Sequence, residues 1–180
     1  MWTQISVAIW LFPIAFMLHD FEEIVVWEAW MGKNRDAILA RLPRFLGRRM
    51  ATIVRTSTPE VALTIALIFL VTVVSTLLAA QWEWYGALLV TSGMFFIHGF
   101  GHFAQAIALR KYVPGVVTSA VVIMPFGIIF FPRLIADGIV DLPGLLLYFA
   151  AGAVLMVPFI LGMHMLGGYL YPRVLRALPR

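Results

Sequence analysis

The sequence predicts an all-α integral membrane protein, a bundle of about five transmembrane helices that forms a single membrane domain over residues 1–180. Of its 180 residues, 62% are hydrophobic and only 12% are charged, whereas a soluble domain is about half apolar and a quarter charged. The apolar residues also form runs that match the roughly 20 residues a helix needs to cross a bilayer.

Each expected span is an apolar run that ends at helix breakers or charged residues. The second span has a recognisable start, because Ser57-Thr58-Pro59-Glu60 combines a hydroxyl cap, an early proline and a glutamate in the first turn. In chain order, the approximate spans are residues 2–30, 59–80, 84–109, 113–131 and 142–170.

The basic residues predict the orientation. Twelve of the 13 Lys and Arg lie in the first connection, the third connection and the C-terminal tail, which leaves Arg133 alone on the opposite side. The positive-inside rule therefore predicts the N-terminus outside and the C-terminus inside, in the plasma or inner membrane of the cell. Tryptophans and tyrosines near both ends of the spans agree with this topology, because their rings prefer the membrane interface.

The basic segment 33–55 has apolar residues at helical spacing among its arginines. From Asn34 to Val54 it is expected to form an amphipathic interfacial helix, bent at Pro43, on the anionic inner leaflet. A solvated cytoplasmic loop is the alternative.

The first span contains His19-Asp20-Phe21-Glu22-Glu23. Ionisable groups at membrane depth cost several kcal/mol, about 3 or more, unless they are compensated, so they indicate a functional site. At 100° per residue, His19, Glu22 and Glu23 fall within an arc of about 100°. One helix face should therefore present an imidazole and two carboxylates to the bundle interior, with Asp20 to one side and Glu28 at the interface.

The third span contains His98 and His102, one helical turn apart. This i, i+4 spacing lets both rings bind one metal or two adjacent metals, and Gln105 on the same stripe is a possible further contact. With a rise of about 1.5 Å per residue, His19, His98, His102 and His164 fall at similar depth in the cytoplasmic half. Instead of a metal site, these residues could form a purely structural network of His and Glu hydrogen bonds. For His164 taken by itself, the alternative is a hydrogen-bonding residue of the bundle core.

Other acidic residues are weaker candidates. Glu60 is explained equally well by capping and by ligation, although it heads a polar stripe with Thr64, Thr72 and Ser75 that should face inward. Asp137 and Asp141 belong to an outer loop and are expected to do no chemistry.

The string His19-Asp20-Phe21-Glu22-Glu23 near the N-terminus of a small, histidine-bearing membrane protein resembles the HXXEE family of membrane proteins. The resemblance implies the membrane architecture over most of the chain. It points to His19, Glu22 and Glu23 and implies no particular reaction.

Histidines and carboxylates without any cysteine suit a divalent metal held by nitrogen and oxygen, with zinc favoured and iron or manganese possible. The first hypothesis is a metal-dependent enzyme that acts on a lipid or apolar substrate near the cytoplasmic leaflet. In a hydrolytic version, His19, His98 and His102 hold zinc while Glu22 or Glu23 is the general base. In an oxidative version, which is slightly less favoured, two irons share the two glutamates and the histidines.

Two other classes of function use the same residues. A proton- or cation-coupled carrier would bind and release its cargo at the buried His and Glu, with dimerisation supplying the internal repeat that the chain lacks. A haem protein would take axial ligands from His98 or His102 and from His164. Membrane lipids are the expected partners, a homodimer is possible, and nucleic acid is not expected.

Overall fold

A computed structural model describes residues 4–41, 51 and 53–177 of the chain, and these residues form helices and connections without a β-strand. The all-α prediction is therefore confirmed. The elements are α1 (Gln4–Arg41), α3 (Thr58–Trp82), α4 (Tyr85–Leu109), α5 (Val116–Thr118), the π-helical turn η1 (Ser119–Ile123), α6 (Met124–Ala136) and α7 (Leu142–Ala177).

Four helical segments of the described chain are long and apolar enough to cross a membrane. They are α3, α4, the continuous stretch Val116–Ala136 and α7. Helix α1 has 38 residues, so it is about 57 Å long, but it carries the carboxylates of the HXXEE motif and is not among the four. The membrane character is thereby confirmed, while the fifth crossing and the orientation stay predictions.

The basic segment begins within α1. This helix continues past Trp30 to Arg41, so Asn34 and the residues up to Arg41 extend the first helix. Residues 42–50 and 52, which include Pro43, lie outside the described part of the chain, so the expected interfacial helix stays a prediction.

The start of α3 has the predicted proline and glutamate in its first turn, at Pro59 and Glu60. Ser57 takes the N-cap position, but its side chain makes no capping hydrogen bond. Instead, the backbone N–H of Thr58 donates to Oε2 of Glu28 over 3.1 Å. A carboxylate from α1 thus satisfies a free N–H at the positive end of the α3 dipole, which ties the two helices together.

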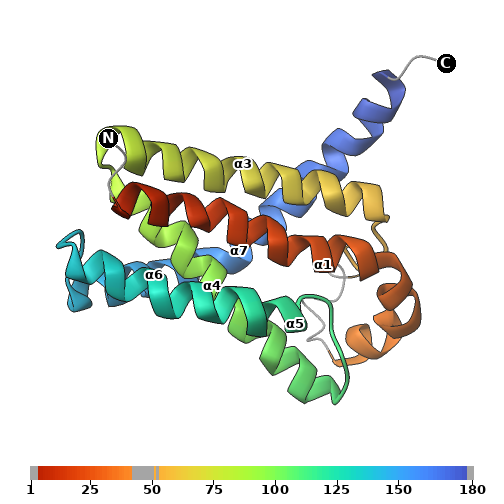
Figure 1. Ribbon diagram of the computed structural model, residues 1–180. Coiled ribbons are helices and arrows are strands. Elements are labelled where there is room, and N and C mark those ends of the chain that lie inside the picture. Colours follow the sequence, from red (N-terminus) through yellow and green to blue (C-terminus); the bar gives the residue numbers. More distant parts are fainter. Residues whose placement is uncertain (1–3, 42–50, 52, 178–180) are drawn as a thin grey trace.

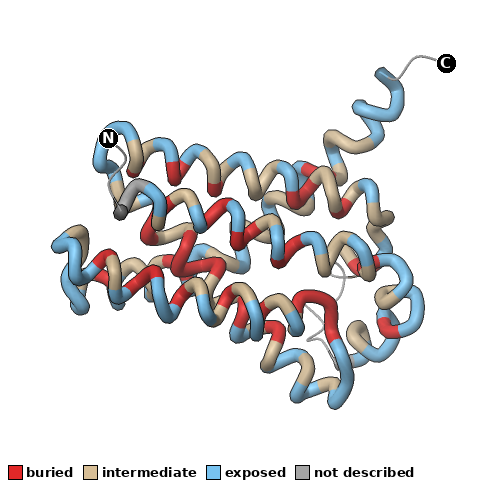
Figure 2. Tube along the Cα trace, viewed as in Figure 1, coloured by how far each residue is buried: buried red, intermediate tan, exposed pale blue. Residues whose placement is uncertain are grey.

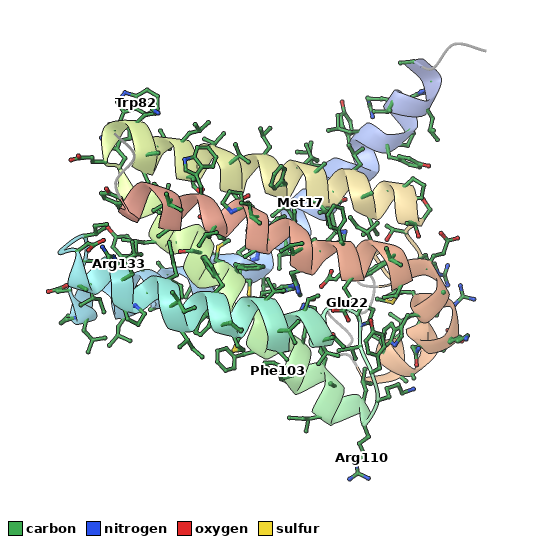
Figure 3. All side chains as sticks on the ribbon, viewed as in Figure 1. Met17, Glu22, Trp82, Phe103, Arg110 and Arg133 are labelled. Carbon is green, nitrogen blue, oxygen red and sulfur yellow. The ribbon has the colours of Figure 1, made fainter. Side chains whose placement is uncertain are left out.

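The helices form one bundle in which α1 packs on α3 and α4 packs on α7 (Figure 1). Buried positions line the sides that face neighbouring helices, while the outer sides are exposed (Figure 2). Trp82 and Arg133 lie at one end of the bundle and Arg110 lies at the other (Figure 3). Aromatic residues form the core beside the polar cluster, with Phe95 in contact with both Phe12 and Phe16.

The polar stripe of α3 faces inward as expected, since Thr64, Thr72 and Ser75 are buried. Their hydroxyls donate to carbonyls of the same helix, at Glu60, Phe69 and Thr72 respectively. This local bonding lets hydroxyl groups lie inside an apolar bundle at little cost.

Candidate metal centre

Helix α1 contributes His19 and Glu23 to one buried cluster, because residues four apart share a helix face. The imidazole of His19 is fully buried. Its Nε2 atom lies 3.5 Å from Oε1 of Glu23. The rings of Phe95 and His19 pack in a T-shaped arrangement, which helps to fix the orientation of His19.

Helix α4 contributes His98 and His102 from the opposite side. Their Nε2 atoms lie 2.8 Å apart. Oε1 of Glu23 lies 3.4 Å from Nε2 of His98 and 2.9 Å from Nε2 of His102. The i, i+4 spacing on each helix thus brings three imidazoles and one carboxylate to a single point.

This arrangement fits a single metal ion. One nitrogen or oxygen atom from each of the four residues lies within 4.8 Å of all the others. Ligands about 2.0–2.1 Å from a tetrahedral zinc ion are about 3.3 Å from each other, close to the separations observed here. Within the described part of the chain, Nε2 of His19 and Oε1 of Glu23 make no hydrogen bond, so both atoms are free to interact with a bound ion or with its water.

Glu22 lies on a different side of α1 and is held by three donors. Its Oε1 accepts a hydrogen bond from the Tyr112 hydroxyl at 2.7 Å. Its Oε2 accepts from the backbone N–H of Thr118 at 2.8 Å and from the Thr118 hydroxyl at 2.6 Å. Partial burial and the bond to Glu22 raise the pKa of Tyr112 above its ordinary value, so the phenol remains a donor at neutral pH. Figure 3 shows Glu22 on the side of α1 that faces the connection between α4 and α5.

The Thr118 hydroxyl connects Glu22 to the cluster. It has one proton, which the Glu22 carboxylate accepts, so it must itself accept from Nδ1 of His19 at 2.9 Å. This bond fixes the His19 tautomer with the proton on Nδ1 and leaves the Nε2 lone pair facing the cluster. Metal-binding histidines commonly have such a partner on the second ring nitrogen.

Gly115 covers the cluster. Its φ angle is +83°, which a side chain rarely allows. A Cβ atom at this position would lie 2.7 Å from Cε1 of His102, 2.8 Å from Cε1 of His19 and 2.9 Å from Oε1 of Glu23. The backbone of the connection between α4 and α5 therefore closes one side of the candidate site, and only glycine fits there.

The same connection is tied to α1 at two further points. Nε1 of Trp30 donates to the carbonyl of Tyr112 at 2.9 Å. Nζ of Lys111 donates to Oδ1 of Asn34 at 2.8 Å. These bonds hold the loop against α1, and thereby hold Gly115 over the histidines.

On another side, the cluster opens into a cavity of about 450 Å³. Its walls come mainly from apolar side chains of α1, α3, α4 and α7, and Glu23, His98 and His102 form part of its surface. A mostly apolar cavity with a few convergent polar groups is typical of small-molecule sites. Helix α3 contributes lining residues such as Val61, Thr64 and Ile65, and α7 contributes others such as Val157, Ile160 and His164.

The other candidates from the sequence lie outside the four-residue cluster. Asp20 and His164 are cavity-lining residues, and Gln105 is an exposed residue that also lines the cavity. Glu60 lies in the first turn of α3, and its Oε1 is 3.1 Å from where a Cβ of Gly168 would be. Sequence reasoning did not find Thr118, Tyr112 or Gly115, because no local pattern links them to the motif.

Fold and site together define a helical membrane protein with a buried His and Glu cluster that could hold a metal ion. The chain belongs to the HXXEE family, described as proteins of unknown function with an HXXEE motif, and the family match covers residues 10–130. The matched region contains the four cluster residues as well as Glu22, Gly115 and Thr118, and it ends before α7. No curated protein and no solved structure matches the chain.

Proposed function

We propose that this protein is a membrane-embedded metal-dependent hydrolase that acts on a lipid or other apolar substrate. The observation that carries the proposal is the convergence of three imidazole Nε2 atoms and the Glu23 carboxylate at the wall of an apolar cavity. Nitrogen and oxygen donors in this number suit zinc, with iron or manganese as alternatives.

The proposal assigns the three imidazoles to metal binding and Glu23 to proton transfer. A zinc ion bound here would lower the pKa of a bound water to about 7. Glu23 would accept a proton from the attacking water, since its Oε1 lies within 3.5 Å of all three Nε2 atoms. Glu22 is the poorer base because Tyr112 and Thr118 already occupy both of its oxygens.

The proposed reaction is the hydrolysis of an ester or amide. The water oxygen forms a bond to the carbonyl carbon, and the bond from that carbon to the leaving oxygen or nitrogen breaks. Glu23 returns its proton to the leaving group, so the products are a carboxylic acid and an alcohol or amine. No electrons are exchanged, and water is the second substrate.

The placement of Glu22 favours hydrolysis over oxidation by two irons. A carboxylate-bridged pair of metals draws several carboxylates to the centre of a bundle. Among the described residues, the cluster has one, Glu23, while Glu22 is directed to the α5 side. A single metal ion therefore accounts for the observed geometry.

Elemental analysis of detergent-purified protein tests the metal site. Wild type should contain zinc, iron or manganese near one equivalent, and His19→Ala and His98→Ala should each lose it. Glu60→Gln is the matched control, because Glu60 is an acidic residue of the same bundle outside the cluster. Activity is then measured on fluorogenic long-chain esters and amides.

The outcomes separate the alternatives. Wild type that holds no metal after reconstitution would overturn the hydrolase and favour a carrier, which pH-dependent flux into liposomes would detect. A Soret band in the visible spectrum would instead establish haem. Bound metal without ester or amide turnover would leave the metal site standing and remove the hydrolytic assignment.

A further inference from the structure

We infer that the cavity beside the metal centre binds a single-chain amphiphile whose head group carries a hydrogen-bond donor, and that Asp20 and His164 recognise this head group. The inference rests on the proposed function, because it names the substrate class for the same site. It stands on two buried polar atoms that the metal cluster does not use.

Asp20 is the first of these residues. Its side chain lines the cavity and the residue is 6% exposed. Its Oδ2 atom is buried, and no group in the described part of the chain donates a hydrogen bond to it. A buried polar atom without a partner is costly, so an acidic side chain kept in this position suggests that a bound molecule supplies the donor.

His164 is the second, and it comes from α7 on the other side of the cavity. Its Nδ1 atom is also buried, and the described residues offer it no hydrogen-bond partner. Two residues on different helices thus line one largely apolar cavity, and each has a buried polar atom without a hydrogen-bond partner among the described residues.

Both residues lie near the depth of Thr64 on α3. Gly167 packs directly against Thr64, and His164 lies less than one turn away on α7. On α1, Nε1 of Trp27 donates to the carbonyl of Thr56, and Asp20 lies about 10 Å along the helix from Trp27. Thr64 lies about 9 Å along α3 from Thr58, the first residue of that helix, in the same direction, so Asp20 and His164 border the same section of the cavity.

The chemistry of these groups selects the occupant. Oδ2 of Asp20 lacks a hydrogen-bond donor among the described residues, so the head group must supply one, as a hydroxyl or amino group does. The remaining walls are largely apolar, for example Phe95, Ile160 and Val61, and suit an alkyl chain. A cavity of about 450 Å³ is in the lower half of the usual range for small-molecule sites, so it suits one chain better than the two of a phospholipid.

The experiment uses the full chain in nanodiscs of phosphatidylcholine, whose head group has no hydrogen-bond donor. The probe is a 16-carbon alcohol with a photoreactive diazirine in its chain, and labelled peptides are mapped by mass spectrometry. Competitors are the unlabelled alcohol, the corresponding amine and the corresponding methyl ether. Alcohol and amine should prevent labelling of cavity-lining residues such as Trp27 and Ile160, while the methyl ether should compete about tenfold less well.

Variants then test whether Asp20 is responsible for the preference for the alcohol over the methyl ether. Asp20→Leu should weaken binding of the alcohol about tenfold, because a buried hydrogen bond to the head group is lost. Asp20→Asn keeps one oxygen acceptor at the same place, so it should still prefer the alcohol over the methyl ether. Thr72→Val is the control, because Thr72 lines the cavity but already bonds to the carbonyl of Phe69.

Equal competition by alcohol and methyl ether would overturn the inference, as would unchanged binding in Asp20→Leu. Loss of metal in Asp20→Leu would also overturn it, because Asp20 would then serve the metal cluster. If Asp20→Leu does not fold, the comparison of Asp20→Asn with wild type decides. Wild type without metal that still prefers alcohol over ether would remove the proposed hydrolase and leave the head-group site intact.

Discussion

Oγ1 of Thr118 lies 2.6 Å from Oε2 of Glu22 and thereby joins the first glutamate of the motif to α5. The same hydroxyl accepts from Nδ1 of His19. The two glutamates of the motif therefore have different surroundings. Glu23 lies with the three histidines, whereas Glu22 holds the residue that orients one of them.

Replacing Thr118 with valine removes the hydroxyl and keeps the shape of the side chain. We expect metal affinity to fall about 10- to 100-fold, because His19 loses the partner that fixes its tautomer. Thr118→Ser retains the hydroxyl and should stay close to wild type. Competition with a chromophoric chelator measures both affinities, and equal affinity of the valine and serine variants would contradict the role of this hydroxyl.

Gly115→Ala should abolish metal binding, because the new Cβ would collide with the rings of His19 and His102. Gly138→Ala is a matched control. Gly138 also has a positive φ, +71°, but no described atom lies within 4 Å of the place that its Cβ would take. Backbone strain is thus common to both variants, whereas the collision is specific to Gly115. Similar metal loss in both, measured by elemental analysis, would show that strain alone is responsible.

Glu23→Gln should lower the turnover of a long-chain ester by about 100-fold or more, the usual contribution of a general base. Glu22→Gln should lose much less, because a glutamine oxygen can still accept from Thr118. Initial rates on metal-loaded protein compare the two variants. Greater loss in Glu22→Gln would exchange the roles assigned to the two residues.

Gly167→Ala should destabilise the contact between α3 and α7. Its Cβ would overlap Oγ1 of Thr64, which already bonds to the carbonyl of Glu60. We expect the free energy of unfolding to fall by about 1–3 kcal/mol. Gly162→Ala on the same helix has no described atom within 4 Å of the added carbon and should be nearly neutral. Unfolding midpoints in mixed detergent micelles test the difference.

The absence of cysteine from the sequence allows a clean test of orientation. Single cysteines placed at Ala136 and Arg176, both exposed positions near opposite ends of the bundle, are labelled in intact cells with a membrane-impermeant maleimide. Ala136→Cys should react from outside, and Arg176→Cys should react only after permeabilisation. The reverse pattern would invert the predicted topology.

Local patterns in the sequence were enough to predict the helical membrane fold and two pairs of cluster residues. Spacings of four residues bring His19 near Glu23 and His98 near His102, whatever the rest of the chain does. Similar depth in the membrane also suggested that the two pairs meet. The same reasoning grouped Glu22 with Glu23, because both lie within the same broad arc of α1.

The sequence by itself determined that this is a helical membrane protein and which ionisable groups enter its bundle, because apolar runs and helical spacing are properties of neighbouring residues. Only the tertiary structure decided that Glu23 joins the histidines while Glu22 bonds to Thr118 and Tyr112. That division depends on how α1 is rotated against α4 and α5. The same long-range packing places Gly115 over the cluster, and no spacing within one helix encodes it.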